Sequence, residues 1–168
     1  MDKFKKILKE YIPYVLIIVI ILLIKTYVFS PIIVNGDSMD STLKDGDVMI
    51  LNKYTYYTSN IKRFDIIVIK YEGRYIIKRV IGLPGDKIKV EDNILYINEK
   101  AYAEEYLDTN TSTEDFEISK IEDGYYFVLG DNREVSLDSR SIGLIKKSDI
   151  EGKATYTLFP FNRFGKKE

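Results

Sequence analysis

The stretch FDIIVIKYEGRYIIKRVIGLPGD, from Phe64 to Asp86, decides the fold that this sequence predicts. Two runs rich in isoleucine and valine flank the dipeptide Glu72-Gly73, and glycine after an acidic residue is a turn signal. β-branched residues favour extended strands because their side chains pack well on a pleated surface. The stretch therefore predicts two antiparallel strands joined by a tight turn.

Further short strands are predicted on both sides of this hairpin. Their sequences are SPIIVNGDSM (30–39), GDVMILNKY (46–54), DKIKVEDNILYINEKAY (86–102, turning at Asp92-Asn93) and EDGYYFVLGDN (122–132). Many short strands between Gly and Asp turns favour a mainly β, antiparallel barrel or sandwich over a parallel α/β sheet. The span 103–120 is the most polar part of the chain, and we expect it to have the least regular shape.

The composition limits the chemistry that the chain can perform. With 168 residues, 45% of them hydrophobic, the chain is sized for one domain with its own core. It has no cysteine and no histidine, which excludes a thiol nucleophile and a Ser–His pair and argues against a metal site, so no cofactor is expected. The formal net charge of −1 gives no support for nucleic-acid binding.

An apolar run at residues 11–29 predicts a transmembrane anchor, because roughly 18 residues at about 1.5 Å each span a hydrocarbon core. Four lysines precede the run, and after Lys25 no cation follows until Lys44. The positive-inside rule therefore places residues 1–10 in the cytoplasm and residues 30–168 outside a plasma membrane crossed once. A cleavable signal peptide and a buried core helix are the alternatives, but no small-x-small cleavage site follows the run.

Two polar residues are candidates for catalysis. Ser38 lies in a turn after Gly36, where glycine permits close approach to another chain, although a polar turn without chemistry explains the same residues. Lys78 lies between Ile76 and Val80 on one predicted strand face, which indicates burial, although a lysine reaching water from a strand edge also fits. An unperturbed lysine is neutral about one time in 2,500 at pH 7, and burial that lowers its pKa by about 3 units makes it an effective base.

Four stretches in order resemble the type I signal peptidases, which are membrane-bound serine/lysine proteases. They are GDSMDSTL around Ser38, GDVMILNKY, the region from RFDIIVIK through YIIKRVIGLPGD around Lys78, and GDNREVSLDSRSIG. The anchor and the tail FPFNRFG fit the same pattern, so the resemblance, to the compact Gram-positive-like form, covers nearly the whole chain. It implies a membrane-anchored serine endopeptidase that removes signal peptides from secreted pre-proteins.

The resemblance implies roles for individual residues. Ser38 would attack the scissile carbonyl, and Lys78 would act as general base. Ser136 would orient the lysine by a hydrogen bond, while Asp138 and Arg140 would form a supporting ion pair.

The resemblance also implies how substrate is held. The oxyanion hole would include the Ser38 N–H, with Gly36 as the second position. A substrate strand would add beside SPIIVNG and the segment before Lys78. The candidate pocket residues are Ile32, Val34 and Met39. The expected partners are pre-protein signal peptides and the lipid bilayer, with the secretion machinery as a further candidate.

The sequence departs from the family pattern at two positions. Ser41 stands where proline is usual, which predicts a less stiff nucleophile loop, and Phe64 stands where glycine is usual. Two other functions stay open: an anchored β-domain that binds pre-proteins without cleaving them, and a self-cleaving regulator that uses the same two residues. Intact Ser38 and Lys78 argue against the first, and the apolar anchor in place of a DNA-binding domain argues against the second.

Overall fold

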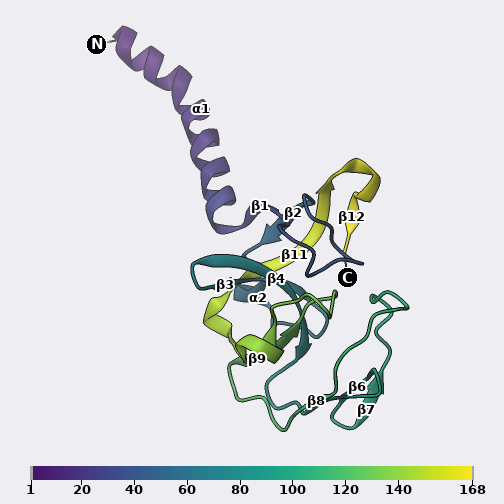
Figure 1. The fold of residues 1–168 in the computed structure, drawn as a ribbon. Helices are drawn as coiled ribbons and strands as arrows, with labels where there is room; N and C mark the ends of the chain where they lie inside the picture. Colours follow the sequence, from purple (N-terminus) through teal and green to yellow (C-terminus); the bar gives the residue numbers. More distant parts are fainter. Residues whose placement is uncertain (1, 168) are drawn as a thin grey trace.

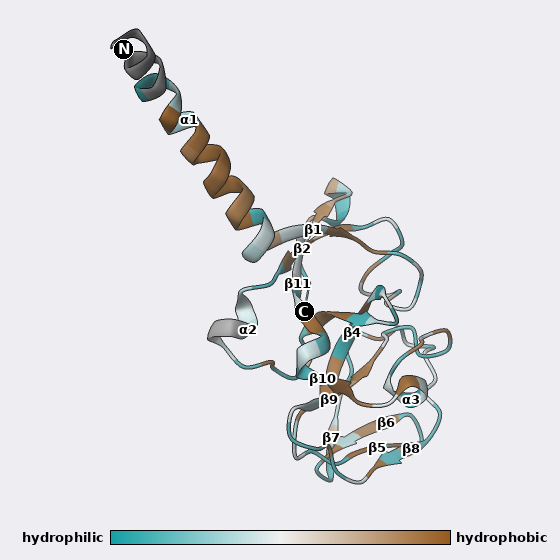
Figure 2. Cartoon of the chain, turned by 90° about the vertical axis from the view of Figure 1, so that its left-hand side faces the viewer, coloured by the Kyte–Doolittle hydropathy of each residue, from teal (hydrophilic) through white to brown (hydrophobic). Residues whose placement is uncertain are grey.

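The computed structural model describes residues 2–167, with the side chains of 9–56 and 59–167. Helix α1 (Asp2–Tyr27) projects from a β-rich body, and the N-terminus lies at its far end (Figure 1). The segment Lys9–Tyr27 is long and apolar enough to cross a membrane, and none of it is buried against the body. Figure 2 shows this apolar surface as a continuous brown stretch.

The helix begins earlier than the apolar run that predicted it. Lysine and glutamate are good helix formers, so the charged residues before residue 11 continue the helix to Asp2. Pro13 consequently lies inside α1 and not in its first turn. The division into 1–10, 11–29 and 30–168 stays a prediction, and the helix is continuous across its first boundary.

The body contains a large antiparallel sheet in the order β1-β2-β11-β3-β4-β9-β10, with β12 paired to β11. Its strands are β1 (Phe29–Ile33), β2 (Val48–Asn52), β3 (Ile66–Tyr71), β4 (Arg74–Gly82), β9 (Tyr125–Leu129), β10 (Ile145–Lys146), β11 (Ile150–Phe159) and β12 (Gly165–Lys166). β1 follows α1 after a single residue, so the edge of this sheet begins where the helix ends.

A second antiparallel sheet has the order β7-β6-β5-β8. It is formed by β5 (Ile88–Glu91), β6 (Ile94–Ile97), β7 (Lys100–Tyr102) and β8 (Phe116–Ile118). The short helices are α2 (Thr55–Thr58), α3 (Ser139–Ile142), η1 (Lys147–Asp149) and η2 (Phe161–Arg163). The predicted class, mainly antiparallel β after an apolar helix, is confirmed. The sheets do not close into a barrel within residues 2–167, so the sandwich-like alternative fits better.

Both predicted hairpins form, with the predicted turns. β3 and β4 pair from Ile66↔Arg79 to Tyr71↔Arg74, and Glu72-Gly73 between them have φ values of 47° and 76°. β5 and β6 turn at Asp92-Asn93, with φ values of 50° and 63°. Two successive positive φ angles match the right-handed twist of the flanking strands, which is why Gly, Asn and Asp occur here.

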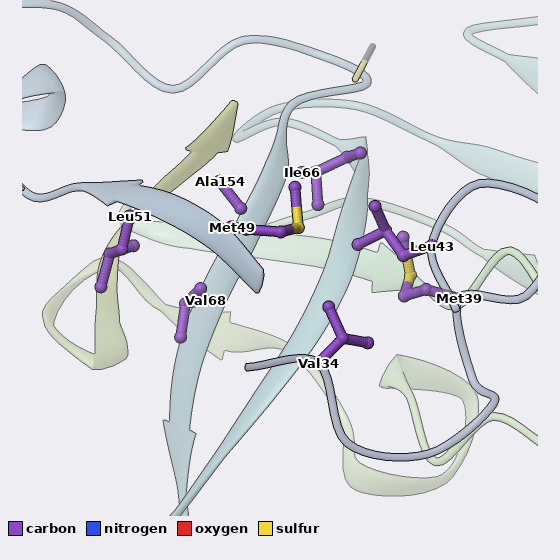
Figure 3. Packing of buried hydrophobic residues seen from close by; sticks show 8 residues of the cluster. All are labelled: Val34, Met39, Leu43, Met49, Leu51, Ile66, Val68 and Ala154. Carbon is purple, nitrogen blue, oxygen red and sulfur yellow. The ribbon is translucent and has the colours of Figure 1, made fainter. Parts of the chain in front are cut away.

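A compact apolar cluster joins the loop after β1 to the large sheet. Eight buried side chains form it: Val34, Met39, Leu43, Met49, Leu51, Ile66, Val68 and Ala154. Figure 3 shows side chains from the loop facing those of the strands. This packing holds the chain on both sides of Ser38 against a rigid surface.

Candidate active site

Ser38 lies in the loop between β1 and β2. Two backbone hydrogen bonds close the base of this loop, from the Val34 N–H to the Asp47 carbonyl and from the Gly46 N–H to the Val34 carbonyl. The side chain of Met39, next to Ser38, is 1% exposed, so it fixes the loop in the core while the serine stays partly accessible. The predicted role of Gly36 in turning the chain agrees with its φ of 85°.

Lys78 meets Ser38 from the neighbouring part of the sheet. Its Nζ donates to Ser38 Oγ at 2.6 Å and to the Ile77 carbonyl at 2.8 Å. The side chain of Lys78 comes from β4 and is 2% exposed, which confirms the predicted burial and rules out a lysine that reaches solvent. Two residues 40 positions apart in the chain are thus in contact across the sheet.

Burial lowers the pKa of Lys78 from 10.5 to about 8, while the charges of Asp138 and Asp131 oppose this effect. An apolar environment solvates an ammonium poorly, so it favours the neutral amine. At a pKa of about 8, roughly one lysine in ten is neutral at pH 7. Lys78 is therefore able to take a proton from a hydroxyl at neutral pH.

Asp138 and Arg140 form the expected ion pair beside the two residues. Arg140 donates to both carboxylate oxygens of Asp138 at 2.9 Å, and the Gly130 N–H donates to Asp138 at 3.0 Å. Burial alone would raise the pKa of Asp138, but these bonds from Arg140 and Gly130 hold it below its usual value. Asp138 also caps α3 by accepting from the Arg140 N–H, so it stabilises local structure as well as charge.

Ser136 lies near the site but does not make the bond expected of it. Its hydroxyl is buried and has no hydrogen-bond partner among the described residues, whereas Lys78 donates to Ser38 and Ile77. The expected bond from Ser136 to Lys78 is therefore not formed in this structure.

The two candidate oxyanion donors differ. The Ser38 N–H has no acceptor within the described part of the chain. The Gly36 N–H donates to Asp45 Oδ1 at 2.7 Å. A carboxylate is a strong acceptor that competes with a developing oxyanion, so the Gly36 N–H is not available in this conformation.

A groove of about 390 Å³ leads to Ser38, and all three predicted pocket residues line it. Ile32 belongs to β1, and Val34 and Met39 lie in the loop that follows it. Tyr75 and Ile77, in the segment before Lys78 that was expected to border the substrate, also line the groove. Leu51 and Val68 were not predicted, and neither were Lys53 and Glu151. For Leu51 in β2 and Val68 in β3, the only signal was the period-2 pattern of their strands, and that pattern does not tell which strands face the loop.

Sequence reasoning also missed the buried pair formed by Arg79 and Asp131. Arg79 follows Lys78, and its Nε and one terminal nitrogen bind the two Asp131 oxygens at 2.9 and 2.7 Å. Both side chains are fully buried. A second cation inside an apolar strand was the available signal, because a buried charge needs a partner.

The chain is similar to known proteins over most of its length. The family model for signal peptidase, peptidase S26, matches residues 8–159. Signal peptidase I of Bacillus amyloliquefaciens is 40% identical over 90% of this chain and 88% of its own, and signal peptidase IB of Staphylococcus aureus is 35% identical over 95% and 93%.

A solved structure supports the same relationship. The crystal structure of a signal peptidase I from Enterococcus faecalis superposes with a TM-score of 0.52 at 36% identity, and the match covers 56% of this chain and 97% of that one. The similarity thus extends from the sequence to the fold. The chain belongs to the signal peptidase family, peptidase S26, and is a serine peptidase.

Proposed function

We propose that this peptidase cleaves signal peptides from pre-proteins with Ser38 as nucleophile and Lys78 as general base. The observation that carries the proposal is the 2.6 Å contact between Lys78 Nζ and Ser38 Oγ. When Lys78 is neutral, the same contact lets its amine take the hydroxyl proton while Ser38 Oγ attacks the scissile carbonyl carbon. The resulting ammonium gives that proton to the leaving amine, and the acyl group stays on Ser38.

Lys78 then serves a second time, because water must release the acyl group. The neutral amine takes a proton from the attacking water, and the ammonium returns it to Ser38 Oγ as the acid product leaves. The Ser38 N–H stabilises the oxyanion in both halves of the reaction. Asp138 and Arg140 support the site through the Gly130 N–H and do not contact the reacting atoms.

The groove suits a substrate bound as an extended strand. β9 pairs with β4 only from Arg79 to Gly82, so the earlier residues of β4 have no strand partner on that side. β1 is the opposite wall and the outer strand of its sheet. An extended peptide between them would bind by backbone hydrogen bonds, and its side chains would alternate into the pocket at Ile32, Val34 and Met39.

Helix α1 would hold the site close to the membrane. Its last turns are tied to the body, because Lys53 Nζ donates to the Thr26 carbonyl at 3.1 Å and Ser30 Oγ donates to the Lys25 carbonyl at 2.8 Å. Ser38 follows Phe29 by nine positions, at most about 30 Å of extended chain. Enzyme and membrane-held pre-protein would then meet in one plane, which raises their effective concentration.

Cleavage of a purified pre-protein by the full chain in detergent micelles tests the catalytic pair. We expect mature protein with the wild type and none with Ser38→Ala or Lys78→Ala. A matched control is Lys70→Ala, since Lys70 lies on the same hairpin but is exposed. Full activity in either catalytic variant would refute the assignment, and tight pre-protein binding without turnover in the wild type would favour a binding domain.

The orientation in the membrane is tested by labelling single introduced cysteines. The chain has no cysteine of its own, so only the introduced thiol reacts. Single cysteines are introduced as Lys9→Cys and Glu122→Cys and treated with a membrane-impermeant thiol reagent on intact cells. Labelling of Glu122→Cys alone is expected if the body lies outside. Labelling of Lys9→Cys alone would reverse the proposed orientation.

A further inference from the structure

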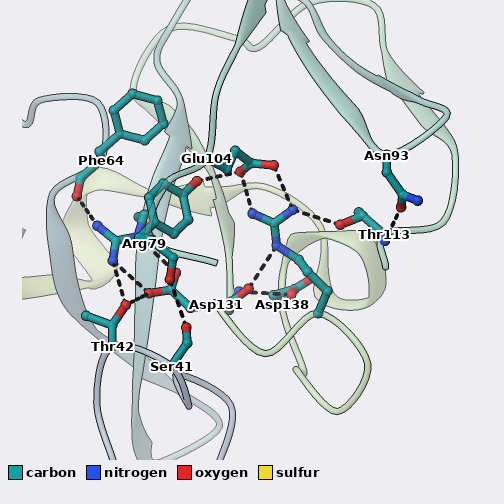
Figure 4. A network of polar contacts seen from close by, with 12 residues as sticks. Ser41, Thr42, Phe64, Arg79, Asn93, Glu104, Thr113, Asp131 and Asp138 are labelled. Atoms are coloured by element: carbon teal, nitrogen blue, oxygen red, sulfur yellow. Dashed lines mark hydrogen bonds and ion pairs between the residues drawn. The ribbon is translucent and has the colours of Figure 1, made fainter. Parts of the chain in front are cut away.

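The segment 103–107, after β7, contacts a residue near each member of the catalytic pair. The Tyr106 carbonyl accepts a hydrogen bond from Ser41 Oγ at 2.9 Å, and Ser41 is three residues beyond the nucleophile. The Tyr106 ring lies against the Arg79 guanidinium, with 3.9 Å between Cζ and the ring centroid, and Arg79 directly follows Lys78. Figure 4 shows the polar contacts around Ser41, Arg79 and Glu104 in this region.

The Arg79 contact matters because Arg79 directly follows Lys78 in β4. Fixing the Arg79 side chain therefore restrains the backbone from which the Lys78 side chain extends. Its guanidinium is fully buried and binds Asp131, Thr42 and the Phe64 carbonyl. A ring over the face of a desolvated guanidinium stabilises it and keeps water away from the ion pair. The Tyr106 ring therefore holds Arg79, and with it this part of β4, in one position.

The Ser41 contact holds an unfavourable backbone conformation in the nucleophile loop. Ser41 has a φ of 91°, which an L-residue seldom adopts and which proline cannot adopt. Its N–H donates to Asp40 Oδ1 at 2.8 Å, and its hydroxyl reaches Tyr106. The loop thus differs from one stiffened by proline: a hydrogen bond to a distant segment replaces the ring.

The same segment also reaches the region behind Ser38. The Tyr106 hydroxyl donates to Glu104, and Glu104 pairs with the buried Arg133. Arg133 Nε in turn donates to the Gly130 carbonyl at 3.1 Å. Gly130 lies directly against the Ser38 carbonyl. The segment is therefore linked to the nucleophile loop twice, once through Ser41 and once through Arg133 and Gly130.

We propose that Tyr106 is a positioning residue for catalysis, whose ring on Arg79 and carbonyl on Ser41 keep Lys78 and Ser38 in hydrogen-bond contact. The inference rests on the proposed roles of Ser38 and Lys78. Neither Tyr106 nor Arg79 nor Ser41 lines the substrate groove. Losing the Tyr106 contacts should consequently slow the chemical step and leave substrate binding nearly unchanged.

Steady-state kinetics of the full chain in micelles, with a synthetic signal-peptide substrate, test this. Tyr106→Leu is expected to lower kcat about 10- to 100-fold, since small displacements of reacting groups have effects of that size, with KM within about threefold. Tyr106→Phe keeps the ring and the carbonyl and is expected to retain most of kcat. Equal losses in kcat for Leu and Phe would refute the role of the ring.

Tyr102→Leu is the matched control. The Tyr102 ring contacts Phe64, as the Tyr106 ring does, and lies over Arg63, which is not next to the general base. It should cost stability without lowering kcat, so equal kcat values in the Tyr102→Leu and Tyr106→Leu proteins would overturn the inference. Normal turnover in Ser38→Ala would instead overturn the proposed function, and this inference with it.

Ser41→Gly keeps the inference testable if Tyr106→Leu does not fold. Glycine adopts the left-handed conformation without strain, so this variant should not unfold at a lower temperature than the wild type. It has no hydroxyl, so the hydrogen bond to the Tyr106 carbonyl is lost. We expect kcat to fall severalfold with KM unchanged. An unchanged kcat in a folded Ser41→Gly protein would show that this tether does not position the nucleophile.

Discussion

Gly130 packs so closely against Ser38 that no larger residue fits. A Cβ added to Gly130 would lie 2.4 Å from the Ser38 carbonyl oxygen and 2.1 Å from Ser136 Oγ. The backbone of the nucleophile loop also accepts a bond from the Asn132 N–H at 3.1 Å. The strand end at β9 therefore serves as the back wall of the site.

Gly130→Ala is expected to remove at least about 99% of peptidase activity, because the added methyl must displace the nucleophile or Ser136. Gly124→Ala is the control: its φ of 80° makes alanine unfavourable by about 1 kcal/mol, but nothing lies within 4 Å of the new Cβ. Pre-protein cleavage and thermal unfolding of both variants separate loss of activity from loss of stability. Normal activity in Gly130→Ala would contradict the close packing.

The pH dependence of kcat/KM should report the Lys78 pKa. Activity is expected to rise with pH through about 8, as the ammonium becomes the neutral amine. Asp138 raises this pKa by its charge, so Asp138→Asn should move the rising limb to lower pH while lowering the maximal rate. Glu122→Gln, an exposed change, should not move it. A limb that moves to higher pH in Asp138→Asn would refute this electrostatic account.

Lys78→Met should inactivate the enzyme and stabilise its fold. The pKa of Lys78 is lower in the folded state than in the unfolded state, so the unfolded chain binds more protons between pH 8 and 10.5. Lys78 therefore destabilises the folded state below this window, and the destabilisation is lost as the pH rises through it. A shift from 10.5 to about 8 corresponds to about 3 kcal/mol.

Denaturant unfolding of wild type and Lys78→Met at pH 7 and at pH 10.5 measures this. The advantage of Lys78→Met should be largest at pH 7 and should shrink by about 3 kcal/mol as pH rises through the window. Other groups titrate in both proteins, so only the difference between them is informative. A difference that is constant with pH would show that the Lys78 pKa is not depressed.

Ile32 and Ile77 should limit the size of the side chain that precedes the cut. Both line the groove beside Ser38, from opposite walls. Ile32→Ala and Ile77→Ala should raise kcat/KM for a leucine-containing substrate relative to an alanine-containing one by about tenfold or more, since each methylene in such a pocket is worth about 1–3 kcal/mol. Ile94→Ala, an exposed isoleucine in the second sheet, should leave the ratio unchanged.

Local patterns predicted much of this fold, whereas the resemblance to a family was needed to select Ser38 and Lys78. The hairpin turns at Glu72-Gly73 and Asp92-Asn93 depend on a few adjacent residues, and both occur as predicted. The apolar neighbours Ile76 and Val80 left burial of Lys78 and a lysine reaching water both open, and the structure shows that Lys78 is buried. The N-terminal end of α1 at Asp2 was not predicted, because hydropathy indicates a membrane span and not where a helix begins.

Contacts between distant residues were not predictable in the same way. The bond from Gly36 to Asp45 depends on how the loop folds back, and the stack of Tyr106 on Arg79 joins the segment after β7 to strand β4. Phe64 adopts a φ of 66°, in the left-handed region that glycine enters more readily than phenylalanine does. A local sequence pattern does not predict these contacts, because each one depends on where separate parts of the chain lie in space.

The amino-acid sequence by itself determined the apolar helix, the antiparallel strands and the two residues proposed for catalysis, because these follow from hydropathy, turn chemistry and short motifs. Only the tertiary structure decided that Lys78 lies 2.6 Å from Ser38, that Ser136 makes no bond to it, and that the Gly36 N–H is occupied. The physical reason is that the pKa of a lysine and the reach of a hydroxyl depend on burial and on partners distant in the chain.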